Sequence, residues 1–256
     1  MTTATTTTTT PHDDWQTNGR GQRLIPDEQG TLLPDQRVST FAGTLDSKAN
    51  LGAWLAWMAL KGTQQPDGGR LFQQAVHAER TPAKVIDALA ELGGSRVAAE
   101  TGSRRHQAVA MALTGADMSA MPADARKELD AIVALIHGLG RVVSVESPTV
   151  NDEARVAGTV DLVLEDPQQR TFVLDLKTGR TVDAISACIQ TMAHARARYW
   201  HDGARGIAVS PARPRLGIIH APQDGSAPRL VEYDPDTARR CYDLAIAVRD
   251  LRKQVR

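Results

Sequence analysis

Two short apolar segments, 157–164 and 171–177, constrain the fold of this chain more than any other feature. Each has the length and the β-branched, leucine-rich composition that is typical of a strand. The residues 166–169 between them read Asp-Pro-Gln-Gln, a composition that favours a turn. We therefore expect a β-hairpin that brings Asp161 of the first strand next to Asp175 of the second.

The second strand carries an acid and a base on one of its faces. Side chains alternate across a strand, so Asp175 and Lys177 share one face, while Leu174 and Leu176 share the other. Two carboxylates as close as those of Asp161 and Asp175 do not readily both stay ionised without a cation, and a divalent metal is the usual one. The plain alternative is a surface hairpin with an exposed ion pair, because Asp-x-Lys is frequent by chance.

Composition narrows the class of protein. The chain has 256 residues, of which 41% are hydrophobic and 23% charged, as in soluble globular proteins. No run approaches the roughly 18 apolar residues of a membrane span and no charged-then-apolar leader opens the chain, so we expect a cytoplasmic protein without a membrane partner. A formal net charge of zero argues against a polycation that binds nucleic acid indiscriminately.

The chain is expected to consist of a tail and one domain. Residues 1–30 begin with a threonine-rich run that has nothing to bury, which predicts a disordered tail. Residues 31–256 are interpreted as a single domain with an N-terminal helical part, 31–94, and a core, 95–256. Trp54 and Trp57 of the helical part, at helical spacing, are interpreted as core residues.

Periodicity and capping residues predict the order of the elements. Helices are expected at 51–60, from 82 to about 92, 95–113, 123–136, 182–200 and 236–253. Strands are expected at 141–146, 157–164, 171–177, 216–220 and 229–233. This order favours an α/β or α+β fold in which helices cover a mixed sheet.

Taken together, the motifs resemble the PD-(D/E)XK nuclease superfamily, and in it the RecB-like exonuclease branch found in bacteriophages. The resemblance covers most of the chain from Val38. It rests on Gly158-Thr-Val-Asp161, Asp175-Leu-Lys177-Thr-Gly179, a following helix with Gln190, Gly102-Ser-Arg-Arg-His106, and the late strand pair from Gly217 to Glu232. It implies a restriction-endonuclease-like mixed sheet flanked by helices, with an N-terminal helical extension.

The resemblance also implies a metal site. Mg²⁺ or Mn²⁺ would be bound by Asp161, Asp175, the backbone carbonyl of Leu176 and the imidazole of His106. Such a cation can activate the attacking water, polarise the phosphate and stabilise the leaving oxygen in phosphodiester hydrolysis. An acid that often follows the histidine one turn later is replaced by Ala110, and a lone histidine on an amphipathic helix is more often structural. No iron–sulfur cluster is expected, because such a cluster takes four cysteines and the chain has two.

Further residues complete the expected site. Lys177 would orient the water and offset charge in the transition state, and Gln190 would bind the lysine or a phosphate. The plain alternatives are a salt bridge from Lys177 to Asp175 and a solvated helix surface for Gln190. Glu146 is either an additional acid of the site or a strand-end surface residue. A locally basic stretch is either a DNA track or a solvated surface; it comprises Arg196, Arg198, Arg205, Arg213 and Arg215.

These features favour a metal-dependent deoxyribonuclease, a phage-type exonuclease of recombination or DNA processing, located in the host cytoplasm if a phage encodes it. DNA is the expected partner, together with a single-strand annealing recombination protein, and a homo-oligomer is left open. A non-cleaving DNA-binding or virion-associated protein on the same fold is the main alternative. An enzyme acting on RNA or tRNA is a third.

Overall fold

The computed structural model describes residues 16–19, 23–26, 31–46, 49–77, 83–201, 204–210 and 212–255. They belong to two compact units. The core unit comprises Met1–Asp46 and Val109–Arg256, and the helical unit comprises Ser47–Ala108. Among the described residues, no helix combines the length and the apolar character that crossing a bilayer requires.

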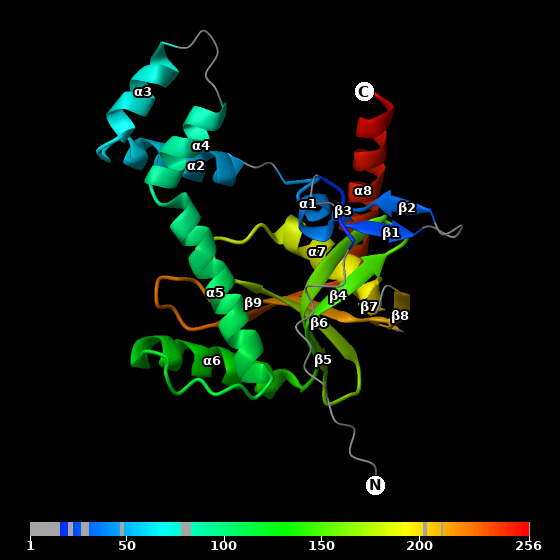
Figure 1. Ribbon diagram of the computed structural model, residues 1–256. Helices are drawn as coiled ribbons and strands as arrows, with labels where there is room; N and C mark the ends of the chain where they lie inside the picture. The colour runs from blue at the N-terminus through cyan, green and yellow to red at the C-terminus, as the bar shows by residue number, and fades with distance from the viewer. Residues whose placement is uncertain are drawn as a thin grey trace. The chain divides into compact units, whose positions relative to one another are not determined.

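A mixed sheet forms the centre of the core unit (Figure 1). Its strands lie in the order β10-β9-β6-β5-β4-β7-β8, and β3 pairs with β5 beside this path. Pairing is parallel between β6 and β9 and between β3 and β5, and antiparallel elsewhere. The strands are β3 (Gln36–Arg37), β4 (Arg141–Asn151), β5 (Val156–Glu165), β6 (Thr171–Lys177), β7 (Arg198–His201), β8 (Ala204–Ala208), β9 (Arg215–His220) and β10 (Arg229–Tyr233).

Helices flank this sheet, as the element order predicted. The main apolar cluster joins the central strands to α1 (Val38–Ala42), α7 (Ala184–Ala195) and α8 (Pro235–Gln254). In it the rings of Phe41 and Tyr242 pack edge to face, with centroids 5.7 Å apart. A further helix, α6 (Ala123–Leu139), buries one apolar stripe. The mixed α and β class with helices around a mixed sheet is thus confirmed.

Part of the predicted N-terminal tail forms a strand. Strands β1 (Leu24–Pro26) and β2 (Leu32–Pro34) form an antiparallel pair. Ile25 is fully buried, in a cluster with Val150, Ala157 and Trp200. The predicted disorder to residue 30 is therefore wrong for β1, because a single buried isoleucine leaves no periodic pattern in the sequence. The rest of the predicted tail, apart from 16–19 and 23, lies outside the described residues.

The helical unit contains α2 (Ala49–Gly62), α3 (Gly68–Val76), α4 (Ala83–Leu92) and most of α5 (Ser95–Leu113). Two glycines allow α2 and α4 to approach at the backbone. A Cβ on Gly62 would lie 1.8 Å from the Leu89 carbonyl oxygen, and one on Gly93 would lie 1.8 Å from that of Met58. Any side chain at either position would push the two helices apart.

Two expectations for this region were wrong. Trp54 and Trp57 were expected in the core, but 36% and 60% of their surfaces are exposed. The helical part was placed at 31–94, whereas residues 31–46 belong to the core unit and the helical unit continues to Ala108. The reason is that Val38 and Phe41 are buried against the core helices.

The helix predicted over 182–200 ends early. It spans Ala184–Ala195, and the chain then enters β7, where Tyr199 and Trp200 are buried. Aromatic residues pack well on a sheet, and here the tertiary contacts override the helical periodicity. Strand β4 likewise runs five residues past its predicted end at Glu146. The other predicted helices and strands are present with small changes at their ends.

Candidate functional site

The predicted hairpin of β5 and β6 is present and places Asp161 beside β6. The two strands pair from Glu165↔Thr171 to Leu162↔Leu174. One residue further on, the Asp161 carboxylate accepts a hydrogen bond of 2.8 Å from the backbone N–H of Leu176. The N–H and C=O of one strand residue point to the same side, so the Leu176 carbonyl also faces β5.

Asp175, Lys177 and Gln190 form a closed polar network. The Lys177 ammonium lies 2.8 Å from Asp175 Oδ2 and donates to Gln190 Oε1 at 2.9 Å. The Gln190 amide donates in turn to Asp175 Oδ1 at 2.5 Å. Asp175 is buried, and Gln190 comes from α7, which contacts β6. The sequence correctly placed Asp175 and Lys177 on one face, and the helix supplies the third member.

Lys177 is held as a cation by its surroundings. Burial alone would lower the pKa of its ammonium group, since desolvation disfavours the charged form. The charge of Asp175, the hydrogen bond to it and the charge of Asp161 outweigh burial, so the pKa of Lys177 is raised above its usual value. This side chain therefore offers a positive charge, not a proton acceptor.

Glu146 lies close to Asp161. One carboxylate oxygen of each residue is within 4.8 Å of the other. Glu146 also has a φ of +46°, in the left-handed region that residues other than glycine seldom adopt. Such backbone outliers cluster at functional sites. Of the two interpretations of Glu146, its position next to Asp161 favours an acid of the site.

Oxygen donors of this kind suit a hard divalent cation. Asp161, Asp175 and Glu146 offer carboxylate oxygens, and Leu176 a carbonyl oxygen, which are the ligands that Mg²⁺ and Mn²⁺ take. His106 lies on α5 in the helical unit. Its predicted role as a metal ligand stays a prediction.

A buried histidine supports the strand of Asp161, and sequence analysis did not assign it a role. His194 of α7 is 2% exposed, and its Nδ1 lies 2.9 Å from the hydroxyl of Thr149. Burial lowers the pKa of His194 to about 4. A Cβ on Gly158 would lie 3.0 Å from the His194 ring, so glycine leaves room for the helix against β5.

A second histidine, His220 of β9, supports the turn after Lys177. It is buried and stands opposite Lys177 in the parallel pairing of β6 and β9. Its Nε2–H donates to the Gly179 carbonyl oxygen, with 2.8 Å between the heavy atoms. The bond ties the chain leaving β6 to the neighbouring strand. Sequence analysis included His220 only in a strand motif, because the contact joins residues far apart in the chain.

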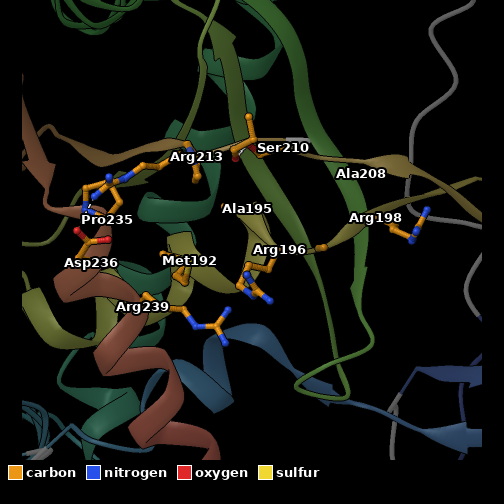
Figure 2. Close-up of a pocket in the computed structure, with 13 residues that line it drawn as sticks. Met192, Ala195, Arg196, Arg198, Ala208, Ser210, Arg213, Pro235, Asp236 and Arg239 are labelled. Atoms are coloured by element: carbon orange, nitrogen blue, oxygen red, sulfur yellow. Dashed lines mark hydrogen bonds and ion pairs between the residues drawn. The ribbon is translucent and has the colours of Figure 1, made fainter.

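The five arginines predicted to bind DNA fall into two groups. Arg215 pairs with Glu232 at 2.8 Å and with Asp166 at 3.2 Å, and its guanidinium lies 4.1 Å from the centre of the Phe172 ring. Arg205 pairs with Asp152 and donates to the Pro26 carbonyl. These two arginines thus hold parts of the core unit together. The other three line one pocket (Figure 2), and these are Arg196, Arg198 and Arg213.

No protein-family model matches this chain, and a search of curated proteins found no match either. The features that bear on function are therefore the geometry of Asp161, Asp175, Lys177 and Gln190 and the resemblance of the motifs that contain them.

Proposed function

We propose that this chain is a metal-dependent deoxyribonuclease of the PD-(D/E)XK type, acting as an exonuclease in phage recombination or DNA processing. The observation that carries the proposal is the network at the end of the β5–β6 hairpin. There Asp175, Lys177 and Gln190 are joined by two hydrogen bonds and an ion pair, and Asp161 accepts a hydrogen bond from the backbone N–H of Leu176, between the first two. An isolated surface ion pair would need neither the buried aspartate nor the glutamine from α7.

Mg²⁺ or Mn²⁺ would be held by Asp161, Asp175 and the Leu176 carbonyl, with Glu146 as an additional acid. When bound, such a cation polarises the phosphate, lowers the pKa of a water molecule and stabilises the leaving oxygen. Its charge would also offset the repulsion between the neighbouring carboxylates. Oδ1 of Asp175 already accepts from Gln190 and Oδ2 is paired with Lys177, so metal binding there competes with that ion pair.

The protein's own groups have separable tasks. Lys177 places a positive charge beside the reacting phosphate and offsets the negative charge that grows in the transition state. Gln190 fixes the ammonium group through its side-chain carbonyl. Asp161 holds the backbone of β6 through the Leu176 N–H. The ion pair with Asp175 keeps Lys177 charged, so we do not assign it the role of general base.

Cleavage of end-labelled linear and circular DNA in Mg²⁺, Mn²⁺ or EDTA tests this function. Wild-type protein should degrade linear DNA with either metal and lose activity in EDTA, and circular DNA should resist an exonuclease. Asp161→Asn and Asp175→Asn should each reduce the rate about 10²-fold or more. Glu165→Gln, also on β5, is the matched control and should retain activity, since its partner is the surface residue Arg141.

Two outcomes would contradict the proposal. Metal-dependent cleavage at the wild-type rate by Asp161→Asn or Asp175→Asn would remove these residues from the site. DNA binding without cleavage under all three conditions would instead support a non-cleaving DNA-binding protein. Circular dichroism and thermal melting of each variant show whether it is folded, so that loss of activity is not confused with loss of structure.

A further inference from the structure

A pocket of about 590 Å³ opens on the core unit, and Asp161, Asp175, Lys177 and Gln190 are not among the residues that line it (Figure 2). It lies where the end of α7, strands β7 and β8 and the start of α8 meet. Arg196, the C-cap of α7, follows Gln190 by six residues, which corresponds to ~9 Å along the helix and about a third of a turn around it. The charged residues that line the pocket are Arg196, Arg198, Arg213, Asp236 and Arg239.

The pocket is locally basic in a chain whose net charge is zero. Arg196 and Arg239 share the carboxylate of Glu153, at 2.6 and 2.9 Å. Arg239 also pairs with Asp243 at 2.8 Å. Arg213 pairs with Asp236 at 2.5 Å, and its side chain extends toward that residue in Figure 2. Three of the four guanidinium groups that line the pocket therefore have carboxylate partners, and the fourth belongs to Arg198.

Arg198 differs from the other three arginines of the pocket. Within the described part of the chain it has no carboxylate partner, and its guanidinium donates only a long hydrogen bond of 3.4 Å to the Gly206 carbonyl. It is exposed and lies at the opposite end of the group from Asp236 (Figure 2). A guanidinium has five N–H donors, so Arg196 and Arg213 also keep donors beyond those bound to carboxylates.

The start of α8 is already occupied by its own groups. The Asp234 carboxylate caps the helix by accepting from the Thr237 N–H, Pro235 has no N–H to offer, and Asp236 lies in the first turn. The attraction for an anion therefore comes from the guanidinium groups of the pocket. Arginine pairs bidentately with phosphate oxygens, which suits a site built from several guanidinium groups.

We infer that this pocket binds a backbone phosphate of a DNA strand outside the cleavage centre. The assignment of this phosphate to DNA rests on the proposed nuclease function, whereas the preference for a phosphate rests on the arginines alone. The site would contribute affinity and position without taking part in the chemical step. It also assigns a common location to three of the arginines that the sequence indicated as a DNA track.

Binding of a fluorescent DNA oligonucleotide in EDTA, where no cleavage occurs, tests the inference. Arg198→Gln and Arg213→Gln should each weaken binding about threefold to tenfold. Each should also reduce the slope of log affinity against log salt concentration by about one. Asp236→Asn should have the opposite effect and tighten binding about threefold, because it removes a negative charge and releases Arg213. Arg240→Gln is the matched control, an exposed neighbour of Arg239 on α8 that does not line the pocket.

The outcomes separate the possibilities. Equal weakening by Arg198→Gln, Arg213→Gln and Arg240→Gln would show a general charge effect and overturn the site, as would weaker binding by Asp236→Asn. If Arg213→Gln weakens binding of the mononucleotide dAMP and leaves DNA binding unchanged, the assignment to a strand is overturned. Failure of the nuclease proposal would appear separately, as absent cleavage with the differences in DNA binding intact.

Discussion

His194 makes the stability of the core unit depend on pH in a way that can be calculated. Burial lowers the pKa of its imidazole to about 4, from an ordinary value of 6.5. The charge of Asp161 raises this pKa, while the charges of Lys177 and Arg23 lower it further. Between these two pH values the unfolded chain binds a proton that the folded chain does not, so stability rises with pH through this window.

The magnitude follows from the two pKa values. With 6.5 in the unfolded state and about 4 in the folded state, lowering the pH from 8 to 5 removes about 2 kcal/mol of unfolding free energy. Below pH 4 the loss levels off at about 3 kcal/mol, since both states are then protonated at this residue. Such a loss is a sizeable part of the 5–15 kcal/mol that is typical of a folded domain.

Urea unfolding of wild type and His194→Gln in EDTA, at pH 8 and pH 5, measures this contribution. Glutamine can still hydrogen-bond the Thr149 hydroxyl but does not titrate. The variant should be less stable at pH 8, and its loss of stability on acidification should be smaller than that of wild type by about 2 kcal/mol. Carboxylates titrate in both proteins and cancel in the difference.

A control and a clear refutation accompany this experiment. His137→Gln removes an exposed histidine of α6 and should keep the wild-type dependence on pH. An identical loss on acidification in wild type and His194→Gln would refute the reasoning, because the buried ring would then not carry the pH dependence.

Three further perturbations have defined outcomes. Lys177→Ala should cut turnover by about 10²-fold with little change in DNA affinity, and Lys177→Arg should not restore it; a loss of affinity alone would make Lys177 a phosphate contact. Ile25→Ala should lower the unfolding free energy in urea by about 2–4 kcal/mol, whereas a neutral effect would return β1 to the tail. Gly93→Ala should lower the melting temperature of the helical unit, because its Cβ would meet the Met58 carbonyl. Gly52→Ala is the control: it has open space around it and should raise stability by up to about 1 kcal/mol. Similar melting of both variants would contradict the close approach of α2 and α4.

The sequence by itself determined the parts of the site that lie within one contiguous segment. Alternation along a strand fixes which side chains share a face, so the joint position of Asp175 and Lys177 followed from their spacing alone. The turn between β5 and β6 also fixed the approach of Asp161 to β6. Both rules act over a few residues and need no knowledge of the rest of the chain.

Only the tertiary structure decided which polar groups acquire partners. Gln190 could have been solvated helix surface, and the contact between α7 and β6 placed it between Asp175 and Lys177. Arg215 and Arg198 look alike in the sequence, yet one is held by Glu232 and Asp166 while the other lines an open pocket. The partners of such side chains lie far away in the chain, so local pattern carries no information about them. The same reason explains Ile25, whose burial depends on Val150 and Trp200 and not on its neighbours in sequence.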